Sequence, residues 1–95
     1  MEPESVVVLD VREPAELSAG MIQHSVSIPL GQLSARVGEL DRGKLIAAHC
    51  QGGYRSSVAT TLLRRAGFRD VANLIGGFDA WKTANLPFVV PESAV

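Results

Sequence analysis

The sequence predicts an α/β fold, with a small, mainly parallel sheet and helices on both faces. Segments with the patterns of strands and of helices alternate along the 95 residues. The connections between successive strands are too long for hairpins, as parallel pairing requires. The first apolar run, Val6–Leu9, is rich in β-branched residues and shows no polar alternation, which is typical of a strand buried on both faces.

The first half of the chain predicts two strands and two helices. Val6–Leu9 is the first strand. A short helix is expected over Pro14–Ala19, because proline suits a first helical turn and a glycine follows the segment. Val26–Ile28 is the second strand, which the next proline ends. Leu30–Leu40 carries apolar residues at spacings of four and then three, which predicts a helix.

The second half repeats this alternation more clearly. Leu45–Ala48 is the third and most apolar strand, and Val71–Leu74 is the fourth. The helix expected over Arg55–Ala66 has a one-sided apolar stripe at positions i, i+4 and i+8. A last short helix is expected over Phe78–Ala84, and we expect its Trp81 to pack the helix onto the sheet.

Composition predicts one small domain over residues 1–95, standing alone or forming part of a longer fusion protein. The chain is 46% hydrophobic and 20% charged, like an average soluble domain. Nine basic and ten acidic residues give a net charge of −1, which favours neither nucleic acid nor an anionic membrane as a partner. The longest apolar runs have four residues, whereas a membrane helix needs about 20. The acidic start, without a leader segment, predicts a cytoplasmic protein.

The single cysteine, Cys50, draws attention because it directly follows the third strand. Open parallel sheets bind ligands beyond the carboxyl ends of their strands. Gly52 and Gly53 permit backbone angles that are closed to other residues. The loop amides and the following helix N-terminus would then surround an anion. Such a setting lowers a thiol pKa from about 8.5 into a range of about 3.5–7.5.

Two interpretations of this thiol compete. A lone cysteine at a strand end is often a small buried hydrophobic residue. The combination of strand, cysteine, paired glycines and an arginine at the helix start favours a nucleophile that needs no neighbouring histidine as a base. The candidate site residues are Cys50 as the catalytic group and, for substrate binding, Gln51, Gly52, Gly53, Tyr54, Arg55 and Ser56.

Other polar residues near this loop have open roles. Arg55 either binds an anion or anchors the loop by pairing with an acidic residue. Ser56 either caps the helix or donates a hydrogen bond to a bound sulfur. Asp10 and Arg12 are expected to hold the end of the first strand through an ion pair or hydrogen bond. Strand alternation predicts that His49 points away from the cysteine.

Four blocks of the sequence occur in the order found in one known family. They are Asp10–Glu13 with Glu16 and Gly20; Ile28–Leu30; Cys50–Ser57; and Gly67–Phe68 with Asn73–Leu74, Gly76–Phe78 and Trp81. Over nearly the whole chain these blocks resemble the rhodanese domains, which are sulfurtransferases. The chain resembles the single-domain type, and its loop is most similar to rhodanese modules attached to metallo-β-lactamase-like persulfide dioxygenases.

The resemblance implies a rhodanese-like fold and a sulfurtransferase. Cys50 would take a sulfane sulfur from thiosulfate or a low-molecular-weight persulfide, hold it as a persulfide, and pass it to a thiol or to cyanide. No cofactor or metal is implied. The implied partners are a small sulfur donor and a thiol acceptor of the glutathione type, with a fused or associated persulfide dioxygenase.

The chain departs from the family pattern in three places. Only nine residues precede Asp10, so we expect the N-terminal element to be shortened. The turn Gly20–Ser25 differs from the family's sequence, which affects the rim of the pocket. The loop between Cys50 and Arg55 carries no charge, so a dianionic donor is expected to bind weakly.

Two other functions compete with sulfur transfer. A phosphatase also places a cysteine and an arginine around an anion, but related phosphatases have five intervening residues and this loop has four. The other alternative is a redox-sensing, persulfide-sensing or protein-interaction module, in which modification of Cys50 is the signal.

Overall fold

The sheet is parallel throughout and has four strands in the order β2-β1-β3-β4. The computed structural model describes residues 6–86 and 88–90. The strands are β1 (Val6–Asp10), β2 (Val26–Ser27), β3 (Leu45–His49) and β4 (Val71–Asn73). Strand β1 pairs with β3 along its whole length, from Val6 opposite Leu45 to Asp10 opposite His49. The register therefore brings the carboxyl ends of β1 and β3 to the same edge of the sheet.

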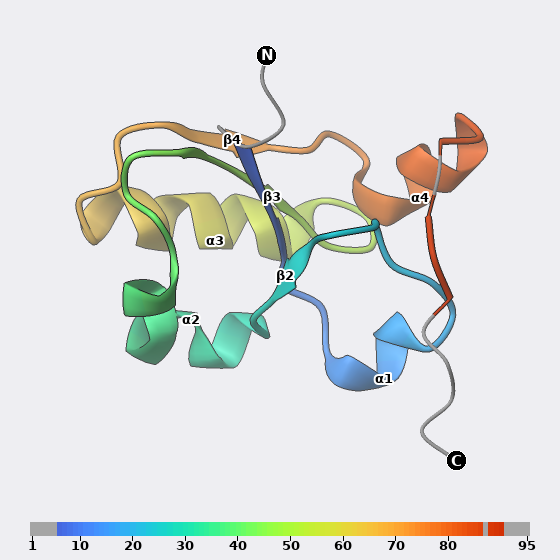
Figure 1. Ribbon diagram of the computed structural model, residues 1–95, viewed down its shortest axis with the longest axis horizontal. Helices are drawn as coiled ribbons and strands as arrows, with labels where there is room; N and C mark the ends of the chain where they lie inside the picture. Colours follow the sequence, from blue (N-terminus) through green and yellow to red (C-terminus); the bar gives the residue numbers. More distant parts are fainter. Residues whose placement is uncertain (1–5, 87, 91–95) are drawn as a thin grey trace.

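Helices connect successive strands, as the expected parallel pairing requires, and a further helix follows the last strand. They are α1 (Pro14–Leu17), α2 (Leu30–Arg36), the 3-10 turn η2 (Val37–Glu39), α3 (Tyr54–Arg65) and α4 (Gly77–Thr83). Figure 1 shows α2 and α3 side by side on one side of the sheet, with α1 and α4 on its other side. The predicted α/β class with a parallel sheet is confirmed.

The main core lies between the sheet and the pair α2 and α3. Alternate residues of the two central strands, such as Leu9 and Ile46, point into it and are fully buried. Helix α3 contributes Ala59 and Leu63 to the same cluster, and α2 contributes Leu33. The apolar stripe seen in the sequence is thus the face of α3 that packs on the sheet.

The opposite face of the sheet is covered near the carboxyl edge by Phe78 of α4. This ring is 1% exposed. It lies 6.5 Å from the ring of His49, centroid to centroid, and its face contacts the guanidinium of Arg12 at 4.4 Å. We expected Trp81 to pack this helix onto the sheet. Phe78 holds that place, while Trp81 is only half-buried.

The strands and the helices α3 and α4 lie within one residue of their predicted bounds, whereas α1 and α2 end earlier than predicted. Helix α1 stops at Leu17, two residues early, where Gly20 turns the chain with a φ of 134°. Helix α2 stops at Arg36 and continues as η2, and the amide of Leu40 donates to the carbonyl of Val37. A glycine inside η2, Gly38, weakens the helical preference there.

One expectation falls outside the described residues. The prediction of a shortened N-terminal element concerns the segment before Val6, which is the first residue that the structure describes. Within residues 6–86 and 88–90, no helix is long and apolar enough to cross a membrane.

Candidate active site

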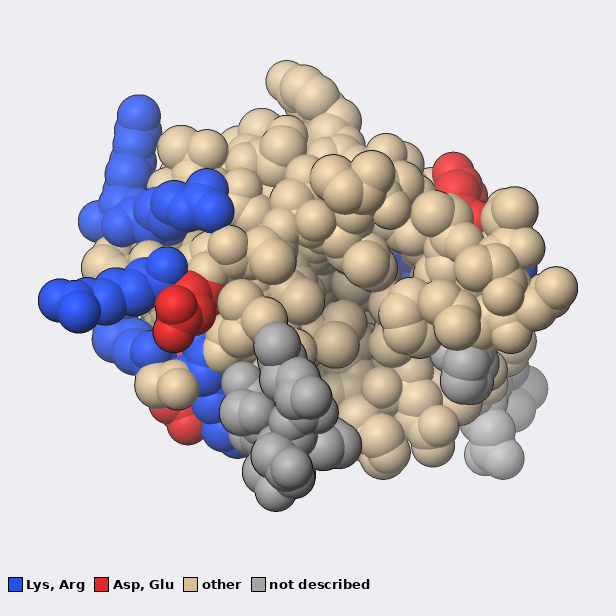
Figure 2. Space-filling model, turned by 90° about the horizontal axis from the view of Figure 1, so that it is seen from above, with Lys and Arg blue, Asp and Glu red and all other residues tan. Residues whose placement is uncertain are grey.

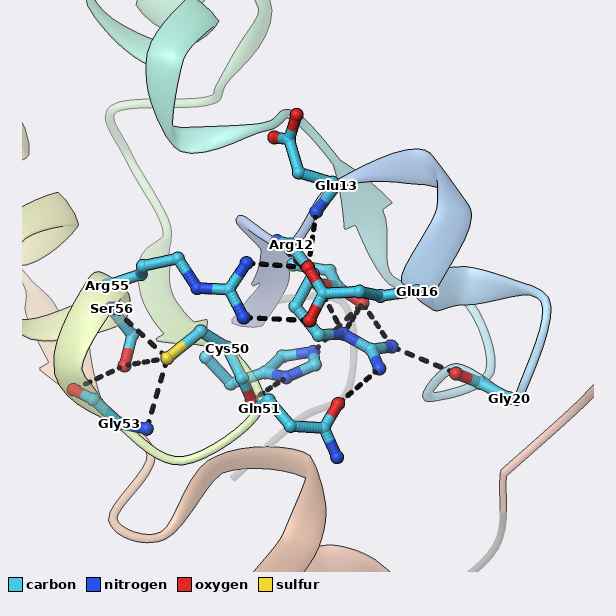
Figure 3. A network of polar contacts seen from close by, with 11 residues as sticks. Arg12, Glu13, Glu16, Gly20, Cys50, Gln51, Gly53, Arg55 and Ser56 are labelled. Atoms are coloured by element: carbon cyan, nitrogen blue, oxygen red, sulfur yellow. Dashed lines mark hydrogen bonds and ion pairs between the residues drawn. The ribbon is translucent and has the colours of Figure 1, made fainter.

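The thiol of Cys50 lies at the centre of the loop that joins β3 to α3. Its side chain is 1% exposed, at the carboxyl edge of the sheet. The amide of Gly53 donates to its sulfur at 3.0 Å, and the amide of Ser56 at 3.4 Å. The hydroxyl of Ser56 lies 3.5 Å from the same sulfur. Figure 3 shows the loop curving around the sulfur so that these groups converge on it. The expected nest of donors is therefore present.

The conformation of the loop depends on one of its two glycines. Gly53 has a φ of 113° and a ψ of −12°, a combination that residues with a side chain rarely adopt. This turn brings its own amide to the sulfur and starts α3 at the next residue. Gly52 is not among the residues with a positive φ, and a Cβ added there would meet nothing within 4 Å. Of the two glycines expected to use backbone angles closed to other residues, only Gly53 does so.

Helix α4 fixes the outer side of the loop. The amide of Phe78 donates to the carbonyl of Cys50 at 2.8 Å, and the amide of Asp79 donates to the carbonyl of Gln51 at 3.1 Å. The approach is so close that a Cβ on Gly77 would lie 2.3 Å from the carbonyl oxygen of Cys50. Since these carbonyls are held by α4, the loop amides are left facing the sulfur.

These contacts change the acidity of the Cys50 thiol. Burial raises its pKa, because removing water disfavours the thiolate. Hydrogen bonds from the side chain and amide of Ser56, and from the amides of Gly53 and Arg55, act in the opposite direction and outweigh burial. The net effect lowers the pKa of Cys50 and favours the thiolate, which is the nucleophilic form.

The hydroxyl of Ser56 connects the sulfur to strand β4. It donates to the side-chain oxygen of Asn73 at 2.6 Å and lies 3.1 Å from the carbonyl of Gly53. A hydroxyl has only one hydrogen, so Ser56 can donate to Asn73 or to a sulfur anion, but not to both. Ser56 therefore serves the sulfur as well as the start of the helix.

Arg55 forms a two-pronged ion pair with Glu16 of α1. Its Nη1 and Nη2 atoms lie 2.6 Å and 2.8 Å from the two carboxylate oxygens of Glu16. Both side chains are 31% exposed. Hydrogen bonding to Arg55 lowers the pKa of Glu16 to about 2. Of the two expected roles of Arg55, the structure shows the anchoring one, and its acidic partner is Glu16.

A second, buried ion pair holds the end of β1. Arg12 and Asp10, 1% and 0% exposed, approach to 2.8 Å between Nη2 and Oδ2. Arg12 also donates to the carbonyl of Gly20 at 2.9 Å and to the side-chain oxygen of Gln51 at 3.0 Å. The amide nitrogen of Gln51 in turn donates to Asp79 of α4. The expected ion pair is confirmed, and Gln51 extends it to the loop.

His49 points away from the thiol, as strand alternation predicts. It is fully buried beside Asp10, with 3.6 Å between His49 Nε2 and Asp10 Oδ2. Burial lowers the pKa of His49, although the charge of Asp10 opposes this effect. The imidazole is therefore neutral at pH 7, and it packs against the ring of Phe78.

The candidate residues do not all gather around the sulfur. Gly53, Arg55 and Ser56 lie next to Cys50, and Gln51 turns its side chain toward Arg12. Tyr54 is 81% exposed, and Gly52 is exposed as well.

Three residues of the site were not singled out from the sequence for the roles they have here. Glu16, Asn73 and Gly77 come from α1, β4 and α4. Each belongs to one of the four sequence blocks that carried the family resemblance. Their place in these blocks is what the sequence offers to find them, since nothing in their neighbouring residues indicates a contact with the loop of Cys50.

The match to known proteins agrees with this geometry. Residues 1–84 match the family model of the rhodanese-like domain. A protein named "Sulfurtransferase" from Allochromatium vinosum is 35% identical over 91 residues, covering 96% of this chain and 85% of that protein. "Thiosulfate sulfurtransferase 16, chloroplastic" from Arabidopsis thaliana is 36% identical, with 83% and 76% covered.

A solved structure shows the same fold. The crystal structure of a rhodanese-related protein from Thermoplasma volcanium superposes with a TM-score of 0.87 at 35% identity. The superposition covers 93% of this chain and 87% of that one. The chain belongs to the rhodanese-like domain family.

Proposed function

We propose that this protein is a sulfurtransferase that carries a sulfane sulfur on Cys50. One observation supports this function most directly: the amides of Gly53 and Ser56 converge on the buried sulfur of Cys50 at 3.0 and 3.4 Å. The same contacts lower the pKa of the thiol despite its burial. Such a site suits a sulfur atom that alternates between a thiolate and a persulfide.

In the first half-reaction the Cys50 thiolate attacks the outer sulfur of the donor. A new S–S bond forms on Cys50 while the bond between the outer sulfur and the rest of the donor breaks. The leaving group is sulfite when the donor is thiosulfate, and a thiolate when it is an organic persulfide. The loop amides then stabilise the terminal sulfur of the Cys50 persulfide, as an oxyanion hole stabilises an oxyanion.

In the second half-reaction an acceptor removes that sulfur. A thiolate attacks the terminal sulfur and leaves as a persulfide, while the electrons of the broken S–S bond restore the Cys50 thiolate. Cyanide does the same and leaves as thiocyanate. Gln51, Gly52, Tyr54 and Arg55 complete the proposed substrate-binding loop. Neither half-reaction as written requires a metal ion or an organic cofactor.

The proposed partners follow from the family resemblance. We propose thiosulfate or a low-molecular-weight persulfide as donor, and a glutathione-type thiol as acceptor, in the cytoplasm. The loop sequence supports a further link to a persulfide dioxygenase, fused to this chain or associated with it.

Intact-mass spectrometry tests the proposal. The protein is measured before and after treatment with thiosulfate and, separately, with glutathione persulfide, with Cys50→Ser as the control. We expect wild type to gain the mass of one sulfur from at least one donor, cyanide to remove it, and Cys50→Ser to gain nothing.

A protein that gains no sulfur from either donor while Cys50 still reacts with an alkylating agent would contradict the proposal. Reversible oxidation of Cys50 without turnover would then favour a sensor or interaction module. Hydrolysis of an aryl phosphate would favour a phosphatase.

A further inference from the structure

The positive charges beside Cys50 are already neutralised. Two guanidinium groups reach the site, those of Arg55 and Arg12. The hydrogen bonds to Glu16 raise the pKa of Arg55 most, and the nearby sulfur of Cys50 raises it further. Both of its Nη atoms are held by Glu16 at 2.6 and 2.8 Å. Arg12 is 1% exposed and is held by Asp10.

Other cations lie elsewhere. Figure 2 shows Lys and Arg side chains gathered at one end of the molecule. Arg64 and Arg65 lie in the last turn of α3, whereas Cys50 lies next to its first turn. Lys82 of α4 lies over the rings of Phe78 and Phe88, at 5.8 and 5.9 Å from their centroids. Among the described residues, Arg55 is therefore the cation placed to meet a substrate at the sulfur.

Glu16 lies on the far side of Arg55 from the sulfur of Cys50. Figure 3 shows the guanidinium of Arg55 between the sulfur of Cys50 and the carboxylate of Glu16. An anionic group that binds Arg55 must displace Glu16 or lie against its carboxylate. Since the pKa of Glu16 is lowered to about 2, this carboxylate stays charged at any working pH.

From this arrangement we propose that Glu16 selects the sulfur donor by its charge. By holding Arg55 in a neutral pair, Glu16 disfavours the dianion thiosulfate and favours organic persulfides, whose reacting sulfur carries at most one negative charge. The inference rests on the proposed sulfurtransferase function. Glu16 acts here through Arg55, as a positioning residue that determines specificity.

Thiosulfate and an organic persulfide differ in the charge of the group that leaves when Cys50 attacks. When thiosulfate reacts, its S–S bond breaks and sulfite leaves with two negative charges beside Arg55. When an organic persulfide reacts, a thiolate leaves with one charge at its sulfur and takes up a proton from water. A neutral Arg55–Glu16 pair therefore opposes the first reaction more strongly than the second.

The variant Glu16→Gln tests the inference. It keeps an oxygen for Arg55 and removes the charge. We measure kcat and KM with thiosulfate and with glutathione persulfide at fixed ionic strength, and compare the ratio of the two kcat/KM values. We expect the ratio of thiosulfate to persulfide use to rise on the order of tenfold, mainly through a lower KM for thiosulfate. A loosened fold would not improve the binding of one donor.

Glu13→Gln is the matched control. Glu13 is exposed at the start of the same helix and makes no ion pair with Arg55, and its replacement changes the net charge equally. It contacts Glu16 through its backbone amide, which donates to Glu16 Oε1 at 3.0 Å and which Glu13→Gln keeps. Its donor ratio should stay within about twofold of wild type, because exposed charges are largely screened. Equal changes in both variants, or an unchanged ratio in Glu16→Gln, would overturn the role of Glu16.

A measurement on wild type covers the case in which Glu16→Gln does not fold. Wild type should load Cys50 from glutathione persulfide at least about tenfold faster than from thiosulfate at equal concentration. Comparable loading from both donors would refute the selection by charge while leaving sulfur transfer intact. No loading from either donor would refute the proposed function itself, so the two failures are distinguishable.

Discussion

Ser56 offers the sulfur of Cys50 both an amide and a hydroxyl, and only the hydroxyl can be removed by substitution. We expect Ser56→Ala to raise the pKa of the thiol, because the side-chain hydrogen bond is the largest effect that lowers it. The loss should also cost about 1 kcal/mol of stability, since Asn73 loses the hydroxyl that donates to it. The rate of alkylation by iodoacetamide, followed against pH, measures the pKa.

Ser57→Ala is the control for this experiment. The hydroxyl of Ser57 is exposed and donates to the carbonyl of Tyr54 at 2.7 Å, away from the sulfur. Its alkylation profile should coincide with that of wild type. If Ser56→Ala gave the same profile as Ser57→Ala, the amides alone would account for the acidity of Cys50.

The adjacent glycines of the loop should respond differently to alanine. At Gly53 the φ of 113° strains any residue with a side chain by about 1–3 kcal/mol. Relaxing that strain moves the amide that lies 3.0 Å from the sulfur, and we expect sulfur-transfer turnover to fall by about tenfold or more. Gly52→Ala should keep most of the turnover, because its Cβ meets nothing within 4 Å. Equal rates in both variants would contradict the role given to Gly53.

At the scale of whole elements, the loop is held from outside by the start of α4. Gly77→Ala should destabilise the protein by about 1–3 kcal/mol, because the added Cβ would lie 2.3 Å from the carbonyl of Cys50 at a φ of +58°. Turnover should fall with it, since α4 can no longer hold the loop carbonyls. Urea unfolding and a sulfur-transfer assay measure the two effects.

Gly31→Ala provides the opposite case within a helix. It lies in α2, where an added Cβ would have nothing within 4 Å. We expect it to be neutral or to stabilise the protein by about 0.5–1 kcal/mol, because alanine favours the helix. A loss of stability equal to that of Gly77→Ala would show that crowding at α4 is not the cause.

The elements themselves could be predicted wherever their pattern is local. The stripe of α3 and the apolar run of β3 specify their types, and the nest around Cys50 is built from residues no more than six positions away. The partners brought by other elements could not be predicted. Nothing local marks Glu16 as the acid that pairs with Arg55, because that contact spans 39 positions and depends on how α1 packs.

Which aromatic ring of α4 is buried could not be predicted from the sequence either. Both Phe78 and Trp81 lie on this short helix, and the larger ring was the better candidate for burial. Phe78 is buried instead because the helix starts against the loop of Cys50, which places its first turn over His49 and Arg12. The choice between the two rings depends on this docking and not on helical periodicity.

At the scale of the molecule, charge is distributed unevenly although the net charge is only −1. Basic side chains gather at the end where α3 terminates (Figure 2), whereas the pair of Glu16 and Arg55 joins α1 to α3 near Cys50. The pair thus links two elements that the sheet alone does not connect. Its loss should affect the stability of the whole fold and not only the substrate preference.

The pH dependence of unfolding measures this link. The pKa of Glu16 is about 2 in the folded protein against 4.5 for an unperturbed glutamate. Because the folded value is the lower one, the pair stabilises the protein fully above about pH 4.5, and this stabilisation is lost as the pH falls toward about 2. Wild type should exceed Glu16→Gln by about 1 kcal/mol at pH 6, since solvent screens a pair that is partly exposed. The difference should vanish near pH 2.

Glu39→Gln separates this effect from that of surface charge in general. Glu39 pairs with Arg36 at 2.7 Å, but Arg36 ends α2 and Glu39 ends η2, which directly continues it, so the pair links only consecutive turns on the surface. Hydrogen bonding to Arg36 lowers the pKa of Glu39 too, so the stabilisation of the fold by this pair is also lost in acid. We expect the free energy that this exposed pair contributes at pH 6 to be smaller than that of the pair of Glu16 and Arg55. Urea titrations of the three proteins between pH 2 and pH 6 decide the matter. If the curves of the two variants coincide, Glu16 contributes no more than an ordinary surface pair. If only the Glu16→Gln curve is flattened between pH 4.5 and pH 2, the contact between α1 and α3 is an acid-sensitive part of the fold.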